Sequence, residues 1–334
     1  MKKTIIIAEA GVNHNGKLSL AKKLIDGASK AGADYIKFQT YNVDLLVAKN
    51  ASLAQYQKKN LKNYINQFSM LKKLQLSEEN QLSLLKYAKK KKIKFLSSAF
   101  DLKSLEFLSN LKLDYFKIPS SELTNIPYLR QLARYNKKTI LSTGLSSLNE
   151  IKQSINVLND AGLTKNKIYL LQCNSEYPSP IKDSNIRAMV RMRELFDMNV
   201  GYSDHTIGIE SSLCAVSLGA SIIEKHITIN KKFKGPDHAA SANINEFKYL
   251  VEKIRNIEKS LGSSEKKITK SERKNKKNVT KYIFSKTKIN KGEIFTSNNL
   301  IPLRSNQGIS VVYWDKIIGK KSKFDFKPGS LIKI

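Results

Sequence analysis

Two histidines follow two successive β-branched runs, and this placement suits a metal site. His205 comes just after the run Asn199–Tyr202, and His226 just after the run Ser221–Glu224. If the runs are neighbouring parallel strands, both imidazoles face the same rim, which brings together two metal ligands that are distant in sequence. The alternative is a pair of unrelated polar residues at strand ends, and the surrounding elements have to decide between the two interpretations.

Short β-branched runs alternate with helix-period segments over residues 1–262. The predicted strands are Thr4–Ala8, Tyr35–Gln39, Ile93–Ser98, Tyr115–Ile118, Thr139–Ser142, Ile168–Gln172, Asn199–Tyr202 and Ser221–Glu224. Predicted helices include Ser19–Lys30, Glu78–Lys89, Leu102–Leu111, Leu148–Asn159, Ile207–Leu218 and a last one, Glu246–Leu261, capped by Gly262. Eight strand–helix units in about 250 residues predict an α/β fold of the (β/α)8 TIM-barrel type. An open doubly wound sheet competes, but no G-x-G-x-x-G motif follows any run.

Polar side chains occupy the ends of all the predicted strands. Because such residues in a TIM barrel point into one site, they are candidates for binding and catalysis. In chain order they are Glu9, Lys37, Gln39, Ser98, Lys117, Ser120, Glu122, Ser142, Ser175, Tyr177, Ser203, His205, Glu224, His226 and Asp237. Any one of these residues could have a structural role alone, for example as a salt-bridged lysine or as a serine at a helix N-cap. Such roles do not explain why every strand end carries a polar group.

These residue types indicate a particular chemistry. Two lysines and several hydroxyls are the groups that hold a phosphate and a carboxylate. Two histidines beside an acid suit a divalent metal with open positions, and the further acids suit a polyol substrate or proton transfer. Because the chain shows neither a nucleophilic cysteine nor a Ser-His-Asp order, acyl transfer is not favoured.

Two segments fall outside the repeating units. The connection from Tyr41 to Ser77 is long for a strand–helix loop, so we expect it to cover the site. Residues 263–281 are polar and highly charged, which predicts a linker with some helical content. The remaining segment, 282–334, contains predicted short strands at Tyr282–Ser285 and Ile332–Ile334 and a small helix near Val312–Ile318. About 53 residues are few for an independent core, so this segment is expected to dock on something else.

Composition narrows the class of protein. The 334 residues carry a formal net charge of +31, yet the lysines are scattered over predicted helix faces and no zinc knuckle is present, so nucleic acid is not the expected partner. The positive field would attract an anionic small molecule. No apolar run approaches the length of a membrane helix. The apolar run at the N-terminus ends at Glu9 and is too short for the apolar region of a signal peptide. Two cysteines form no disulfide framework, so a cytoplasmic location is expected.

The chain resembles the sialic acid synthases over its whole length. The stretches that carry the resemblance are IAEAGVNHNG at 7–16, IKFQT at 36–40, FKIPSSEL at 116–123, ILSTG at 140–144, QCNSEYPSP at 172–180, GYSDHT at 201–206, IIEKHIT at 222–228 and GPDHAAS at 235–241. Residues 282–334 resemble that family's C-terminal antifreeze-like domain, a small β-rich SAF or β-clip domain. The resemblance implies a TIM-barrel catalytic domain at 1–262, a linker at 263–281 and the antifreeze-like domain at 282–334, capping the partner subunit's active site in a domain-swapped homodimer.

The resemblance also implies a role for most of the strand-end residues. His205 and His226 are expected to hold a divalent metal, usually Mn²⁺, with Mg²⁺ or Co²⁺ as other options. Lys37, Ser98, Lys117, Ser120, Ser142 and Ser203 are expected around phosphoenolpyruvate. The open-chain amino sugar is expected to meet Glu9, Gln39, Glu122, Tyr177 and Asp237, with Glu122 and then Glu9 as candidates to move a proton. Arg304 is expected to reach the partner subunit's site and contact the N-acyl group.

The implied reaction is the condensation of phosphoenolpyruvate with N-acetylmannosamine to give N-acetylneuraminate and phosphate by C–O cleavage, a step that supplies cell-surface polysaccharides. The alternative within the family is a legionaminate or pseudaminate synthase that uses a 2,4-diacetamido trideoxyhexose. A synthase for a phosphorylated sugar, or a non-catalytic sugar- or anion-binding protein, are remoter alternatives. The loop after Arg304 departs from the family's usual Pro-Gly-Asn-Gly, which leaves recognition of the N-acyl group, and hence the exact sugar, open. Ser98-Ala99-Phe100 replaces Thr-Pro-Phe, but the hydroxyl is kept, so phosphate binding is expected to survive.

Overall fold

The computed structural model describes residues 3–60 and 66–334, and the chain divides into two compact units, Met1–Gly262 and Ser263–Ile334. Five residues of the predicted long connection, 61–65, lie outside the described residues. No helix in the described part of the chain is long and apolar enough to cross a membrane.

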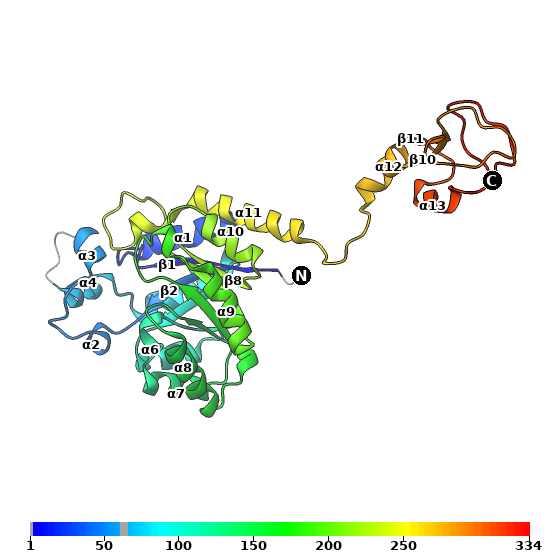
Figure 1. Ribbon diagram of the computed structural model, residues 1–334. Coiled ribbons are helices and arrows are strands. Elements are labelled where there is room, and N and C mark those ends of the chain that lie inside the picture. Colours follow the sequence, from blue (N-terminus) through cyan, green and yellow to red (C-terminus); the bar gives the residue numbers. More distant parts are fainter. Residues whose placement is uncertain (1–2, 61–65) are drawn as a thin grey trace. The chain divides into compact units, whose positions relative to one another are not determined.

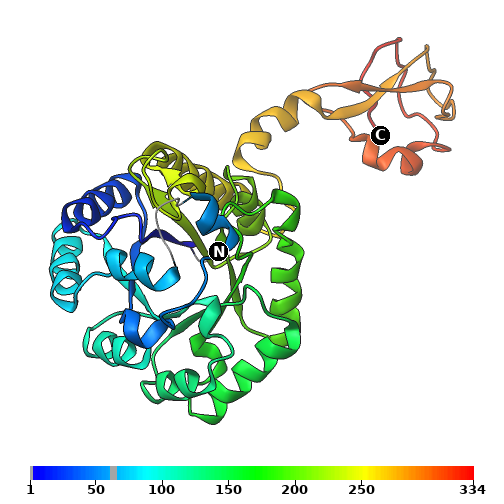
Figure 2. The same cartoon turned by 90° about the vertical axis from the view of Figure 1, so that its left-hand side faces the viewer.

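The first unit is a closed barrel of parallel strands surrounded by helices (Figures 1 and 2). Its strands are β1 (Ile5–Gly11), β2 (Tyr35–Thr40), β3 (Lys94–Ala99), β4 (Phe116–Ile118), β5 (Thr139–Ser142), β6 (Ile168–Cys173), β7 (Asn199–Asp204) and β8 (Ile222–Thr228). Each strand pairs in parallel with the next, and β1 pairs with β8 to close the barrel; the short β9 (Ala242–Asn243) continues from β8. The predicted TIM-barrel fold is confirmed.

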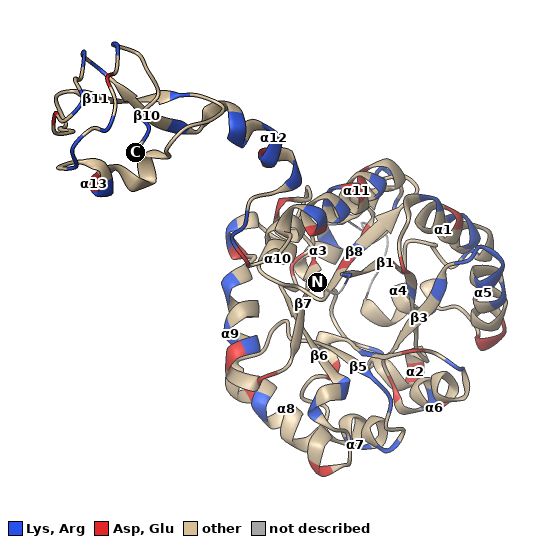
Figure 3. Ribbon diagram, turned by 90° about the vertical axis from the view of Figure 1, so that its right-hand side faces the viewer, with Lys and Arg blue, Asp and Glu red and all other residues tan. Residues whose placement is uncertain are grey.

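Amphipathic helices cover the outside of the barrel (Figure 2). They are α1 (Leu18–Ala31), α5 (Glu78–Lys90), α6 (Leu102–Asn110), α7 (Ile126–Arg134), α8 (Leu148–Asp160), α9 (Ile186–Phe196), α10 (Glu210–Ser217) and α11 (Ile244–Leu261). Capping boxes start α8 at Ser147 and α11 at Asn243, which fixes where these helices begin. Their apolar faces pack on the strands, and their lysines and arginines are spread over the helices (Figure 3).

The barrel interior changes from apolar to polar along the strands. Residues two apart on a strand share a face, so each inward apolar residue is followed by an inward polar one. The apolar layer comprises Ile7, Tyr35, Leu96, Tyr115, Ile140, Tyr169, Leu171 and Ile222. The polar layer two residues further on contains the buried side chains of Glu9, Lys37, Ser98, Lys117, Ser142 and Glu224. The apolar layer therefore keeps water away from the side of the polar layer that faces the barrel interior.

Three strands run two or more residues further than the sequence predicts. Strand β1 continues to Gly11, β7 to Asp204, and β8 through His226 to Thr228. The predicted ends at Ala8, Tyr202 and Glu224 are wrong, because the polar residues that follow them still alternate between the barrel interior and the helix layer. Polarity at these positions marks the polar layer of the interior, not the start of a loop.

The described part of the long β2–α5 connection contains three short helices, α2 (Val43–Leu46), α3 (Gln55–Asn60) and α4 (Gln67–Leu74). It has its own apolar cluster, in which Val12, Tyr41 and Met70 are buried. The Tyr41 hydroxyl donates a hydrogen bond to the Leu71 carbonyl at 3.1 Å. A Cβ at Gly16, which has φ +72°, would lie 2.4 Å from the Lys73 carbonyl oxygen, so only glycine allows the β1–α1 loop to pack this closely against α4.

The second unit contains α12 (Lys270–Val279), an antiparallel pair β10 (Lys281–Ser285) and β11 (Leu300–Arg304), and α13 (Trp314–Ile317). Its small core consists of Ile283, Ile289, Phe295, Leu300, Ile317, Phe326 and Ile332. The predicted strand Ile332–Ile334 is wrong: only a bridge between Phe284 and Leu331 forms there, and β11 is the true partner of β10. The charged segment predicted as a linker contains the exposed helix α12.

Candidate active site

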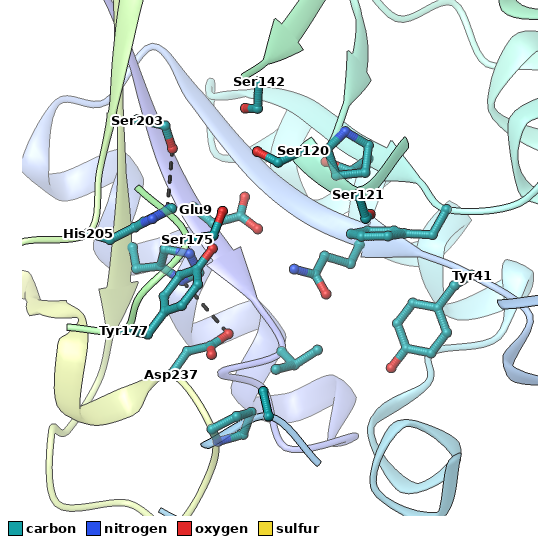
Figure 4. Close-up of a pocket in the computed structure, with 18 of the residues that line it drawn as sticks. Glu9, Tyr41, Ser120, Ser121, Ser142, Ser175, Tyr177, Ser203, His205 and Asp237 are labelled. Atoms are coloured by element: carbon teal, nitrogen blue, oxygen red, sulfur yellow. Dashed lines mark hydrogen bonds and ion pairs between the residues drawn. The ribbon is translucent and has the colours of Figure 1, made fainter. Parts of the chain in front are cut away.

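A pocket of about 530 Å³ lies at the carboxyl ends of the barrel strands. Every barrel residue predicted for the site lines it: Glu9, Lys37, Gln39, Ser98, Lys117, Ser120, Glu122, Ser142, Ser175, Tyr177, Ser203, His205, His226 and Asp237. Figure 4 shows the labelled members of this set turned toward one another. Arg304 belongs to the second unit, where it is exposed at the end of β11.

Two buried lysines and two buried glutamates form the floor of the pocket. Lys37 Nζ lies 2.9 Å from Glu9 Oε2, 3.4 Å from Glu224 Oε2 and 3.2 Å from the Ser98 hydroxyl. Lys117 Nζ lies 2.6 Å from the Ser142 hydroxyl and 3.5 Å from Glu224 Oε1. These contacts bring residues from β1, β2, β3, β4, β5 and β8 to one point of the barrel axis.

The two glutamates differ in charge because their surroundings differ. Burial raises the pKa of Glu9 to about 7, although Lys37 opposes the shift. Burial works in the same direction on Glu224, but Lys117, Lys37 and a hydrogen bond from Ser203 outweigh it and lower its pKa to about 2. Carboxyl groups with pKa values pushed apart in this way are suited to different roles.

The lysines depend on these carboxylates for their charge. Burial opposes the charge of Lys37, but Glu224 and Glu9 outweigh it and raise its pKa. Burial lowers the pKa of Lys117, and Lys37 adds to that effect, whereas Glu224 works against it. Glu224 therefore stabilises both cations. The sequence places Glu224 among the strand-end residues but assigns it no role, and its central position depends on which strands face one another.

The two histidines lie side by side with fixed orientations. Their ring centroids are 5.4 Å apart, and the His205 ring stacks on Tyr177 at 4.2 Å. The Nδ1 of His205 contacts the Asn174 carbonyl, so its Nε2 faces the pocket, 3.4 Å from the Ser203 hydroxyl. Burial lowers the pKa of His205 to about 4, and burial lowers that of His226 well below its usual value. Both rings are therefore neutral and able to donate lone pairs to a metal at neutral pH.

These residues fit a divalent metal with open positions. Within residues 3–60 and 66–334, the buried Nδ1 of His226 has no hydrogen-bond partner, and Asp237 Oδ2 is 4.0 Å away. A Cβ at Gly11, which has φ +49°, would lie 3.3 Å from both Glu9 Oε1 and His226 Cε1, so glycine keeps this space open. No cluster of three or more His, Cys, Asp or Glu ligands is found in the described residues. A metal here would thus take two imidazoles from the protein and leave positions for substrate.

The candidate acids are not equivalent. Glu122 lines the pocket, but its carboxylate accepts hydrogen bonds from Asn125 Nδ2 at 2.6 Å and from the Ser121 hydroxyl at 3.2 Å. Asp237 is buried beside His226, and burial raises its pKa to about 7. Burial thus raises the pKa of both Glu9 and Asp237, whereas hydrogen bonds from Asn125 and Ser121 hold the Glu122 carboxylate in place.

Close backbone approach shapes the hydroxyl-lined side of the pocket. The Gly144 N–H donates to the Ser120 hydroxyl at 3.1 Å. A Cβ at Gly144 would lie 2.4 Å from the Ser175 hydroxyl and 2.9 Å from that of Ser120. Glycine is therefore required where the β5–α8 loop passes these two serines. The resulting cluster of hydroxyls next to Lys117 can hold an anionic group.

The β2–α5 connection contributes another part of the pocket lining. It supplies apolar side chains, among them Leu46, Met70 and Leu71, together with the polar side chains of Gln57 and Gln67. The prediction that this connection would cover the site is supported by its place in the lining. A ligand in the pocket would therefore meet charged groups from the strands and both apolar and amide groups from the connection.

Comparisons with known proteins cover both units. The NeuB family model matches residues 24–266, and the SAF domain model matches residues 280–334. N,N'-diacetyllegionaminic acid synthase of Campylobacter jejuni is 47% identical over 333 residues, 100% of each chain. The Legionella pneumophila protein of the same name is 41% identical, over 98% of this chain and 92% of its own. A crystal structure of the sialic acid synthetase of Leptospira borgpetersenii superposes with a TM-score of 0.73 at 33% identity, covering 82% of this chain and 90% of that one.

Proposed function

The chain belongs to the NeuB family, as its motifs predicted, and we propose that it condenses phosphoenolpyruvate with an open-chain 2,4-diacetamido trideoxyhexose to form N,N'-diacetyllegionaminate and phosphate. Members of this family are enzymes that synthesise sialic-acid-like sugars. The observation that carries the choice of sugar is the 47% identity to a legionaminic acid synthase along the whole chain, against 33% to a sialic acid synthetase. The alternative of a legionaminate synthase thus has more support than the N-acetylmannosamine reaction first expected from the motifs.

The pocket side chains of the β2–α5 connection support the same choice. A trideoxy sugar carries a methyl group in place of the 6-hydroxyl, and its second acetamido group adds another methyl. Met70, Leu71 and Leu46 offer these two methyl groups apolar contact, and the neighbouring Gln57 and Gln67 can hydrogen-bond the amides of the acetamido groups.

Phosphoenolpyruvate is assigned to the lysine end of the pocket. Lys37 and Lys117 neutralise its phosphate and carboxylate. The hydroxyls of Ser98 and Ser142 accept hydrogen bonds from these lysines, so their own O–H groups can donate to the substrate from fixed strand positions. Ser203 lines the same end of the pocket and donates its O–H to Glu224. The dry apolar layer beneath these groups strengthens each of these electrostatic contacts. The enol carbon is thereby held between the lysines and the sugar.

The sugar aldehyde is assigned to the histidine end, where its C1 becomes the new bonding carbon. A divalent metal held by His205 and His226 would polarise this aldehyde, as the resemblance implies for Mn²⁺. Attack by the methylene carbon of phosphoenolpyruvate forms the carbon–carbon bond, water adds at C2, and phosphate leaves with the bridging oxygen. Asp237 and Glu9 have pKa values near 7 and can supply or accept the protons that the alkoxide and the water require.

A turnover assay with two sugars tests this proposal. We expect kcat/KM for the 2,4-diacetamido trideoxyhexose to exceed that for N-acetylmannosamine by about 10- to 100-fold, because one pocket contact discriminates on that scale. Phosphoenolpyruvate labelled at its bridging oxygen should release labelled phosphate. An equal or reversed preference between the two sugars would contradict the choice of sugar. Label retained in the sugar acid would contradict C–O cleavage. If neither sugar led to phosphate release, a non-catalytic binding protein would be favoured.

We further propose a domain-swapped homodimer in which the C-terminal unit of one chain caps the barrel of the other, with Arg304 contacting the sugar's N-acyl group. Mixing two inactive variants tests the swap. A dimer of Arg304→Ala with His205→Ala places an intact arginine over an intact barrel, so co-refolded chains should recover about a quarter of wild-type activity, as random pairing of a two-fold dimer requires. Lys281→Ala, at the register partner of Arg304, is the control and should stay active alone. If mixing restored no activity, Arg304 would act in the active site of its own chain or in neither active site of the dimer.

A further inference from the structure

A buried ion pair links β7 and β8 on the side that faces the helices. Asp204 and Lys225 are register partners, with Nζ 2.9 Å from Oδ2 and side chains 0% and 2% exposed. The surrounding helix-facing layer is apolar and includes Tyr202, Ile223 and Ile227. Apolar replacements of a buried ion pair are often neutral or stabilising. Stability alone therefore does not explain why these two strands carry charges where others carry alanine, isoleucine or phenylalanine.

The pair brackets the first histidine on both sides. Asp204 Oδ1 accepts hydrogen bonds from the backbone N–H of Thr206 at 2.9 Å and from its hydroxyl at 2.7 Å. Lys225 Nζ donates to the Thr206 carbonyl at 2.8 Å. His205 is the residue between Asp204 and Thr206, so the ion pair closes a loop around its backbone. These bonds fix the backbone that carries the imidazole from the side that faces the helices.

The same pair determines the position of the second histidine. Lys225 immediately precedes His226 on β8, and its ammonium is held by groups on both sides of His205. Asp204 also accepts a hydrogen bond from the Ser212 hydroxyl on α10 at 2.6 Å, which anchors the assembly to the helix layer. A shift of β8 along β7 would break these bonds together. The distance between the two imidazoles therefore depends on the pair.

We propose that Asp204 and Lys225 are positioning residues that set the spacing of His205 and His226 so that both imidazoles can hold one divalent metal. Neither residue lines the pocket, so each acts through the histidine that follows it. This inference rests on the metal-holding role given to the histidines in the proposed function. A positioning role differs from a purely structural role because it predicts weaker metal binding even in a variant whose stability has been restored.

Direct Mn²⁺ titration of full-length variants separates the two roles. Lys225→Met leaves a buried carboxylate without its cation, and we expect a lower thermal midpoint together with weaker Mn²⁺ binding. The double variant Asp204→Asn/Lys225→Met has no buried charge, so its thermal midpoint should return toward wild type while Mn²⁺ affinity stays about 10- to 100-fold weaker. Free Mn²⁺, measured by its electron paramagnetic resonance signal, gives the affinity without any turnover. Lys225→Arg, which keeps the charge, should recover part of the affinity.

The control is Arg255→Met, which breaks another ion pair at the opposite end of the barrel, where Arg255 Nη2 lies 2.8 Å from Asp34 Oδ2. It should lower the thermal midpoint and leave Mn²⁺ affinity unchanged. Wild-type affinity in the double variant, or equal weakening in Arg255→Met, would overturn the positioning role while leaving the metal site intact. Absence of Mn²⁺ binding by the wild-type protein would overturn both this inference and the metal-holding role proposed for the histidines.

Discussion

His205→Ala is expected to reduce kcat by about 1000-fold, since Lewis-acid activation of a carbonyl is worth several kcal/mol. The same variant should lose saturable Mn²⁺ binding, because one imidazole would remain at the site. His205 contributes little to the barrel core, and its ring contacts are with Tyr177 and His226 inside the pocket. The KM for phosphoenolpyruvate should stay near that of the wild type, because Lys37 and Lys117 are unchanged.

His14→Asn is the matched control for this variant. His14 is as buried as the pocket histidines but lies outside the pocket lining, where its Nδ1 accepts the Gly16 N–H at 3.0 Å. An asparagine side chain can accept the same hydrogen bond, so kcat and Mn²⁺ affinity should persist with a modest loss of stability. Full metal-stimulated turnover in His205→Ala would refute the ligand assignment.

Glu224→Gln is expected to lower kcat/KM for phosphoenolpyruvate by about 100- to 1000-fold, which is the usual cost of losing one preorganised electrostatic group in an active site. Glutamine keeps an acceptor for the Ser203 hydroxyl but no longer compensates the charges of Lys37 and Lys117. Burial already lowers the pKa of Lys117, and Glu224 opposes that shift. The pKa of Lys117 should therefore fall further in the variant.

The sign of the pH dependence makes this prediction specific. Lys117 is charged below its pKa, so kcat/KM of the variant should recover as the pH falls and decline further as it rises. In the wild-type protein Glu224 has a pKa of about 2 and stays ionised across this range, so the lysines keep their charge. Glu210→Gln, on the exposed first turn of α10, is the control and should leave the profile unchanged. A Glu224→Gln variant with unchanged or lower KM for phosphoenolpyruvate would contradict the role of Glu224.

The sequence alone determined the barrel and most of its inward-facing side chains. Local alternation explains this success: Ile7 and Glu9, or Tyr35 and Lys37, lie two residues apart on one strand, so their common face follows from strand geometry without any knowledge of neighbours. The motifs likewise identified the family. They could not separate the sugars, because one or two pocket contacts decide among hexosamines.

Only the tertiary structure decided which of these groups act on one another. The barrel places Glu224 of β8 within reach of lysines on β2 and β4, and that contact across the barrel separates the pKa values of two glutamates that look alike in sequence. It also gives the Glu122 carboxylate two hydrogen-bond donors, Asn125 and Ser121, which strand alternation does not predict. Distances across the barrel depend on strand register and closure, which involve all eight strands together. A residue's spacing along the chain therefore predicts the direction of its side chain, and the closed barrel decides the groups that it meets.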